Sequence, residues 1–128
     1  MTENSMKAVE YHKSGFSCSA AVLNAFRDEI FMDEIQALSA AAPMAGGRMI
    51  KCGAVLAAEY VIRNKYDGET AERKISEFEK EFASLNQSLV CKELKGAGTG
   101  KVLRSCRGCV SDSAEILERL IKTEFKSE

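Results

Sequence analysis

Apolar residues recur along the chain with the three-to-four-residue spacing of helices, and no segment alternates apolar and polar residues as a half-buried strand does. The spacing predicts a first helix from about Asn4 to Ser14, ended at Gly15. Ser17 is expected to cap a second helix. The apolar residues of that helix form one stripe, which consists of Cys18, Ala21, Val22, Ala25, Phe26 and Ile30.

The middle of the chain predicts two further helices on either side of a glycine loop. Asp33, followed three residues later by Gln36, resembles a capping box that opens a helix reaching about residue 43. The Gly46-Gly47 pair then marks a loop. After it, the segment from about Cys52 to Asn64 is apolar nearly all round, so we expect this helix at the centre of the bundle.

The last third of the chain predicts two long helices separated by a short turn and a loop. Thr70 is expected to cap a helix to about Asn86, with Ile75, Phe78, Phe82 and Leu85 facing inward. A turn over residues 89–94 and a loop with glycines at 96, 98 and 100 follow. The final helix, about 102–125, carries on one side Cys106, Cys109, Val110, Ser113, Leu117, Leu120 and Ile121. The pattern therefore predicts one all-α domain over residues 1–128, a compact irregular or orthogonal bundle of five to seven helices.

Composition and charge narrow the classes of function. The chain is 45% hydrophobic and 29% charged, the balance of a globular soluble protein. Its 18 basic and 19 acidic residues nearly cancel, so neither nucleic acid nor an anionic membrane surface is an expected partner. The opening residues lack the basic and then apolar layout of a signal peptide, and the apolar runs are too short to span a bilayer. We therefore expect a cytoplasmic protein with no membrane insertion.

The sequence argues against a hydrolase. The single histidine, His12, has no evident serine and aspartate partners for a catalytic triad. The sequence also lacks paired carboxylates in an apolar setting. His12 lies near the end of the first predicted helix. There we expect it to interact favourably with the helix dipole rather than to act as a ligand or a proton shuttle.

Five cysteines, Cys18, Cys52, Cys91, Cys106 and Cys109, are the feature that calls for explanation. In a reducing compartment they are not expected to form a disulfide scaffold. Cys18 and Cys52 each fall in the first turn of a predicted helix, where free backbone N–H groups and the helix dipole favour a thiolate.

The segment around Cys52 carries further candidate features. Arg48 and Lys51 directly precede Cys52, so we expect their positive charges to favour its thiolate further. Gly53 allows a ligand or a second backbone to approach closely. The loop formed by Gly46, Gly47 and Arg48 could hold an anion at the helix N-terminus. It matches no nucleotide-binding fingerprint, so a tight turn that positions Cys52 is the preferred interpretation.

The remaining cysteines lie in the second half of the chain. Cys91 lies in the short turn beside Lys92 and Lys95. Cys106 and Cys109 form a CxxC motif on a helix, where their thiols could bond to each other or share a metal ion. Each of the five cysteines falls at a helix start, in a short turn or on a buried stripe, so several of them can meet. Such a cluster fits dithiol–disulfide exchange or a soft-metal or iron–sulfur site.

Four segments resemble the motifs of the C_GCAxxG_C_C family of redox-active proteins. The segment 15–23 (GFSCSAAVL) resembles the family's first cysteine motif, and 46–57 (GGRMIKCGAVLA) its CGAxxG signature. Phe78 and Phe82, followed by 91–94 (CKEL), resemble the third block, and 106–110 (CRGCV) with 114–117 the fourth. The chain departs from the signature at Ala57, where the family has glycine.

The resemblance implies a redox role carried by Cys18, Cys52, Cys91 and Cys106, with Cys109 as an addition of this chain. A related domain in split-Soret cytochromes adds an iron–sulfur or haem-associated alternative. Our leading hypothesis is thiol-based redox chemistry, with Cys52 as the activated thiolate and one of the other three cysteines of this set as its resolving partner.

Two alternatives stay open. The same four cysteines could ligate zinc or an iron–sulfur cluster, or all the thiols could be inert packing in a structural or interaction module. The sequence does not identify a cofactor, the redox partner, or whether the protein is an enzyme. A very apolar central helix is compatible with a homodimer.

Overall fold

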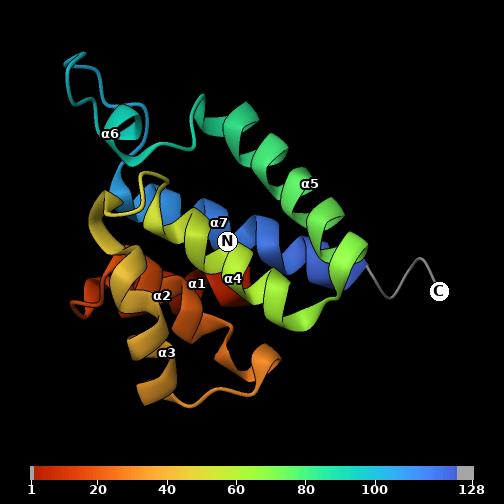
Figure 1. Cartoon of the computed structure of the whole chain (residues 1–128). Coiled ribbons are helices and arrows are strands. Elements are labelled where there is room, and N and C mark those ends of the chain that lie inside the picture. The colour runs from red at the N-terminus through yellow and green to blue at the C-terminus, as the bar shows by residue number, and fades with distance from the viewer. Residues whose placement is uncertain (1, 124–128) are drawn as a thin grey trace.

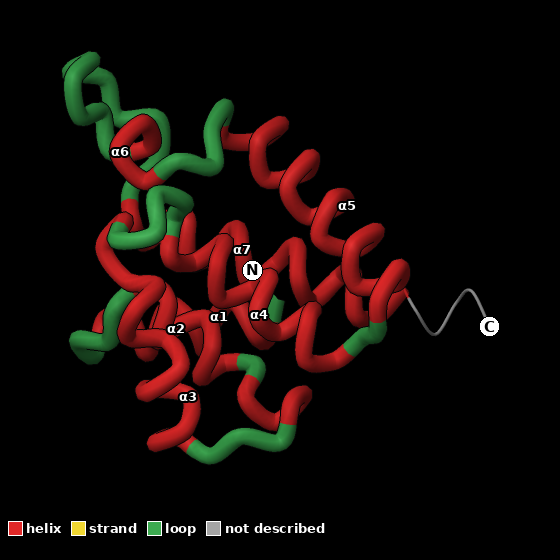
Figure 2. Tube along the Cα trace, viewed as in Figure 1, coloured by secondary structure: helices red, strands yellow, loops and turns green. Residues whose placement is uncertain are grey.

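The computed structural model describes residues 2–123, and within them it is built from helices without a strand (Figures 1 and 2). The predicted all-α fold is therefore confirmed. In chain order the elements are α1 (Glu3–Lys13), α2 (Cys18–Ala25), η1 (Arg27–Ile30), α3 (Glu34–Ala41), η2 (Ala42–Gly47), α4 (Gly53–Lys65), α5 (Gly68–Asn86), α6 (Cys91–Leu94) and α7 (Cys106–Thr123), where η denotes a 3₁₀ helix.

Helix starts in the first third of the chain follow the predicted capping residues. The Ser17 hydroxyl accepts a hydrogen bond from the Ala20 amide at 3.2 Å. Asp33 and Gln36 form a reciprocal capping box, with bonds of 2.8 and 3.0 Å. Each bond satisfies a backbone donor that the helix itself leaves free. These starts were predictable because both partners of each bond lie within four residues of each other.

The start and the inward face of α5 differ from the prediction. The N-cap is Asp67, in extended conformation, and the Ala71 amide bonds to its carbonyl, so Thr70 lies inside the helix rather than capping it. Leu85 is 60% exposed. The inward stripe continues from Phe82 to the buried Asn86, and Leu85 lies one residue to its side.

The start of α7 also differs, because α7 begins at Cys106 rather than near residue 102. The amides of Leu103 and Arg104 both bond to the Leu94 carbonyl, which holds this segment against the end of α6. The predicted end at Phe125 lies outside the described residues.

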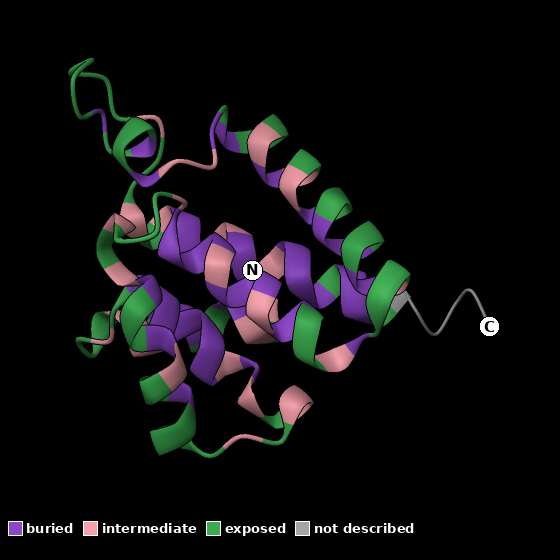
Figure 3. Ribbon diagram, in the orientation of Figure 1, coloured by how far each residue is buried: buried purple, intermediate pink, exposed green. Residues whose placement is uncertain are grey.

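The central helix of the bundle is α4, as its apolar sequence predicts. It contacts α2, α5 and α7, and α7 in turn contacts α1, α2 and α5. Figure 3 shows α4 mostly buried, whereas α5 is buried along one face only. None of the described helices is both long and apolar enough to cross a bilayer. The arrangement places the beginnings of α4 and α7 at the end of the bundle where α6 lies (Figure 1).

Candidate functional site

All five cysteines line one small cavity at this end of the bundle, together with Leu94, Lys95 and Arg104. The cavity holds about 10 Å³, which is space for about one water molecule. Four cysteines are buried, and Cys106 is half-buried. The structure thus brings together the four cysteines named from the sequence and adds Cys109 to them.

The beginnings of helices place the sulfurs around the cavity. Cys18, Cys91 and Cys106 are the first residues of α2, α6 and α7, and Cys52 is the N-cap residue of α4. Cys109 lies one turn after Cys106 on α7. The placement of Cys18 and Cys52 at helix starts agrees with the sequence prediction, and for the longer helices α2, α4 and α7 such a position favours a thiolate.

A pair of backbone hydrogen bonds ties the segments of Cys52 and Cys91 together. The Cys52 amide donates to the Leu89 carbonyl at 2.8 Å, and the Cys91 amide donates to the Ile50 carbonyl at 3.0 Å. These bonds form an isolated antiparallel bridge between Lys51 and Val90. The bridge holds together the segments of two cysteines that are 39 positions apart in the chain, and both cysteines line the cavity.

Two of the predicted binding glycines pack directly against sulfur atoms. A Cβ on Gly53 would lie 2.6 Å from the Cys18 sulfur, and one on Gly47 would lie 3.1 Å from the Cys91 sulfur. The backbone amide of Gly46 interacts with the Cys18 sulfur. Arg48 is exposed and donates to the Ala42 carbonyl at 3.4 Å. The glycines therefore allow helices and loops to approach the thiols, which is the role that a missing side chain permits.

Cys18 and Cys106 form one hydrogen-bonded thiol pair. The hydrogen bond from Cys106 lowers the pKa of Cys18 to about 5, with further help from the amides of Gly46 and Ser19 and from the charge of Lys95, and against the effect of burial. The same hydrogen bond, together with burial, raises the pKa of Cys106. At neutral pH the pair thus holds one proton, with the negative charge on Cys18.

Cys52 and Cys109 form a second such pair. The hydrogen bond with Cys109 lowers the pKa of Cys52, and the backbone amides of Val55 and Ala54 act in the same direction. The bond with Cys52, followed by burial, raises the pKa of Cys109. This pair lies deeper than the first, with exposures of 5% for Cys52 and 2% for Cys109.

Lys95, which follows Cys91 in the sequence, interacts with three of the thiols. The pKa of Lys95 is raised, first by its interaction with Cys91 and then by those with Cys106 and Cys18. Arg104 also lines the cavity but forms two hydrogen bonds, of 3.0 and 3.1 Å, to Asp112. Lys95 therefore compensates charge on the sulfurs of Cys91, Cys106 and Cys18, whereas Arg104 interacts first with Asp112 and only then with Cys109.

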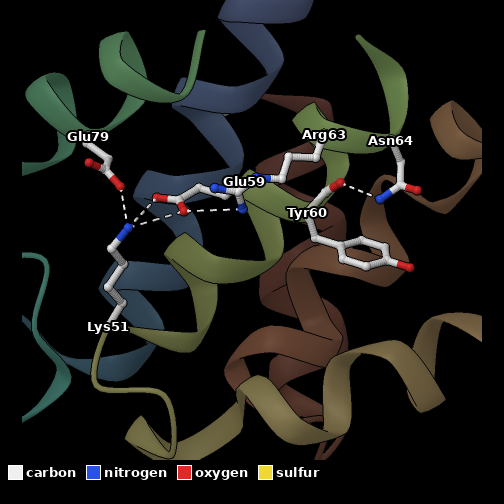
Figure 4. Close-up of polar contacts among 6 residues, drawn as sticks. All are labelled: Lys51, Glu59, Tyr60, Arg63, Asn64 and Glu79. Carbon is white, nitrogen blue, oxygen red and sulfur yellow. Dashed lines mark hydrogen bonds and ion pairs between the residues drawn. The ribbon is translucent and has the colours of Figure 1, made fainter. Parts of the chain in front are cut away.

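Lys51 does not serve Cys52 as the sequence suggested. Its ammonium lies 3.3 Å from a carboxylate oxygen of Glu59 and 2.5 Å from one of Glu79, as Figure 4 shows. Arg63 lies 3.8 Å from Glu59 on its other side. Figure 4 also shows the side-chain amide of Asn64 donating a hydrogen bond to the backbone carbonyl of Tyr60, one turn earlier on α4; this bond is 2.8 Å long. The ammonium of Lys51 thus pairs with these carboxylates rather than with the Cys52 thiol. Lys51 helps to position Cys52 through its backbone, which forms the bridge with Val90.

Glu59 is the buried member of that cluster, with 1% of its surface exposed. Burial and the hydrogen bond with Glu79 raise the pKa of Glu59 to about 7, against the opposing charge of Lys51. The pKa of Glu79 is lowered, first by the same hydrogen bond. The two carboxyl groups therefore share a proton near neutral pH, which the sequence did not reveal.

His12 lies beside Arg107, whose Nε donates to the histidine Nδ1 at 3.2 Å. Burial first, and then the Arg107 charge, lower the pKa of His12. His12 lies in the last turn of α1, as predicted, and its favourable interaction with the helix dipole stays a prediction.

The placement of the side chains and the volume of the cavity both bear on whether the cysteines could hold a metal group. Residues 2–123 contain no group of three or more His, Cys, Asp or Glu side chains placed to hold a metal ion. A cavity of about 10 Å³ does not fit a haem or an iron–sulfur cluster in this arrangement. Ligation of zinc or iron by Cys18, Cys52, Cys91 and Cys106 stays a prediction.

Three residues that line the cavity were not among the site residues predicted from the sequence: Cys109, Lys95 and Arg104. Cys109 was regarded as a local addition, although its spacing from Cys106 places both on one face of α7. Lys95 follows Cys91 by four residues, and its side chain reaches back to that cysteine. Both spacings can be read from the sequence, but they assign Cys109 and Lys95 to the site only once α6 and α7 are known to border the same cavity.

A family model described as "Putative redox-active protein (C_GCAxxG_C_C)" matches residues 16–120. The chain belongs to the C_GCAxxG_C_C family. The description supports a redox role in general and names no reaction. No curated protein and no solved structure matches the chain significantly. The C_GCAxxG_C_C match includes α2, α4, α6 and the start of α7, which supply every cysteine of the cavity.

Proposed function

We propose that the protein carries out thiol–disulfide redox chemistry with Cys18 and Cys106 as its working pair. The observation that carries the proposal is the hydrogen-bonded pair itself, which keeps one sulfur ionised at neutral pH and leaves the other half-exposed. A thiolate is the reactive form of cysteine, and exchange needs a sulfur that a partner can reach. Membership of a redox-active family supports this choice over inert packing.

The reaction is an exchange between a Cys18–Cys106 disulfide and two thiols of a partner, of which one is ionised. The partner thiolate attacks the half-exposed Cys106 sulfur and forms a mixed disulfide, and Cys18 leaves as the thiolate that its surroundings stabilise. The second partner thiol then attacks the partner sulfur of the mixed disulfide, and Cys106 leaves and takes up the proton of that thiol. Two electrons pass from the partner to the pair, a partner disulfide forms, and every step is reversible.

The test is a count of thiols on protein equilibrated in glutathione buffers, with the disulfides mapped by mass spectrometry. We expect a Cys18–Cys106 disulfide in the wild type, none in Cys18→Ser, and a normal one in Cys91→Ser, which alters a buried thiol of the same cavity outside the pair. Thiols that react only after unfolding would instead indicate an inert module. Metal analysis of the same protein purified anaerobically tests the ligand alternative, since stoichiometric zinc or iron on the cysteines would overturn the proposal.

A further inference from the structure

The deeper thiol pair has no route of its own to a partner. Cys52 and Cys109 are 5% and 2% exposed, and they line the same cavity as the half-buried Cys106. The cavity itself is too small to admit a partner sulfur with its substituent. We therefore expect exchange of the deeper pair with the outside to pass through Cys106, the half-exposed sulfur of the cavity.

Helix α7 provides the connection between the two pairs. Cys106 bonds with Cys18, and Cys109, one turn later, bonds with Cys52. Residues three apart on a helix lie on the same face, so the α7 sulfurs project towards the same cavity. The charge of Cys106 also acts on Cys109, as expected for neighbouring groups.

We propose that the two pairs form an internal disulfide relay, in which a transient Cys106–Cys109 bond passes oxidation from the outer pair to the buried pair. The relay rests on the proposed function, because the outer pair must first be oxidised. It makes each chain a carrier of four electrons rather than two. It also gives a role to Cys109, which the family motif does not include.

The relay proceeds by two exchanges that conserve atoms and electrons. Starting from a Cys18–Cys106 disulfide, the proton of the inner pair moves to Cys52, and the Cys109 thiolate attacks the Cys106 sulfur. The Cys106–Cys109 bond forms and Cys18 leaves as a thiolate, the form that its surroundings stabilise. Cys52 then gives up its proton, and its thiolate attacks Cys109 and displaces Cys106, which takes that proton. The inner pair has lost two electrons, the outer pair has gained them, and no outside reactant is consumed.

The first experiment counts oxidised thiols against time under excess oxidised glutathione. The wild type is expected to lose four thiols in two phases, with the Cys18–Cys106 disulfide appearing before the Cys52–Cys109 disulfide. Cys109→Ser should keep the fast phase and lose the slow one, so that only two thiols are oxidised. Cys91→Ser is the matched control, with four thiols lost in two phases. Loss of four thiols by Cys109→Ser, or simultaneous appearance of both disulfides in the wild type, would overturn the relay.

The second experiment traps the bridge. In the double variant Cys18→Ser, Cys52→Ser, oxidation should join Cys106 to Cys109, and Arg107 between them lets trypsin separate the two into disulfide-linked peptides. A disulfide from Cys106 to Cys91 instead would refute the proposed path. If no Cys18–Cys106 disulfide forms in the wild type, the proposed function fails. If that disulfide forms but the slow phase is missing, the relay alone fails.

Discussion

The α-carbon of Gly53 lies so close to the Cys18 sulfur that a methyl group there would sit 2.6 Å from the sulfur and 2.8 Å from the Met44 carbonyl oxygen. The first turn of α4 thus packs directly on the first residue of α2. This contact brings the two thiol pairs to one cavity, and it requires that residue 53 have no side chain.

Gly53→Ala should therefore lower the free energy of unfolding by about 1–3 kcal/mol, the usual cost of overpacking a core, and displace Cys18 from its hydrogen-bond partners. Urea unfolding and the rate of Cys18 alkylation measure the two effects. Gly98→Ala is the control, because it strains a backbone with φ +85° but meets no atom within 4 Å. Unchanged Cys18 reactivity in Gly53→Ala would contradict the packing described here.

Cys106→Ala should raise the pKa of Cys18, because it removes the hydrogen bond that lowers this pKa most. At pH 6 the alkylation rate of Cys18 should fall by about tenfold or more, because its pKa should rise towards that of a free thiol, about 8.5, and the thiolate fraction falls tenfold for each unit by which the pKa exceeds the pH. The rate is followed by mass spectrometry between pH 4 and 9. Cys106→Ser keeps a hydroxyl donor, so its rate of Cys18 alkylation should lie between those of the wild type and Cys106→Ala. Equal rates at every pH in all three proteins would show that Cys106 does not lower the pKa of Cys18.

Lys95→Met should also slow alkylation of Cys18 at pH 4, by about threefold, because the positive charge of Lys95 favours the thiolate and the thiolate fraction is most sensitive to the pKa at a pH below it. The smaller effect reflects a charge acting over distance rather than a direct hydrogen bond. Lys92→Met is the matched control on α6, because Lys92 is exposed and does not line the cavity. High salt should reduce the difference between Lys95→Met and the wild type, and an equal effect of both substitutions would argue against a local role for Lys95.

Glu59→Gln should change how stability depends on pH. The folded-state pKa of Glu59, about 7, lies above the usual glutamate value of 4.5. The stability that this group contributes is therefore full below pH 4.5 and is lost as pH rises through 7. Glutamine does not titrate. Between pH 4.5 and 7 the free energy of unfolding of the variant should therefore rise relative to that of the wild type, by up to about 1.4 kcal/mol per pH unit.

Comparing Glu59→Gln with the wild type at each pH removes the opposite contribution of Cys18, whose lowered pKa adds stability as pH rises above about 5. The pKa of Glu79 is lowered, so the stability that Glu79 contributes changes only at pH values more acidic than this range. Urea unfolding at pH 5, 6, 7 and 8 under reducing conditions gives the difference. A constant difference across this range would mean that Glu59 does not carry the shared proton.

The parts of the fold that could be predicted are those decided by near neighbours in the chain. The Asp33–Gln36 capping box and the burial of α4 follow from residues within a few turns of one another. Lys51 was assigned to Cys52 because it is adjacent in sequence, but its side-chain partner Glu79 is 28 positions away. Such a pairing depends on how α4 and α5 pack, which periodicity does not specify.

The same limit applies to the thiol site. Cysteines at helix starts could be recognised one at a time, and the family resemblance suggested that they act together. Which thiols pair could not be predicted, because Cys109 meets Cys52 only through the crossing of α4 and α7. The unexpected pairing is the reason why Cys109 moves from a local addition to part of the candidate site.

The convergence of α2, α4 and α7 on one cavity has a thermodynamic consequence for the proposed chemistry. Helix N-termini stabilise thiolates, and a disulfide carries no charge for them to stabilise. The reduced state is thereby favoured, which shifts the reduction potential of the couple to less negative values than that of a structural disulfide. Net electron flow should then run from partner thiols into this protein, so that in the cell it would act as an oxidant that donates disulfides rather than a reductant that removes them.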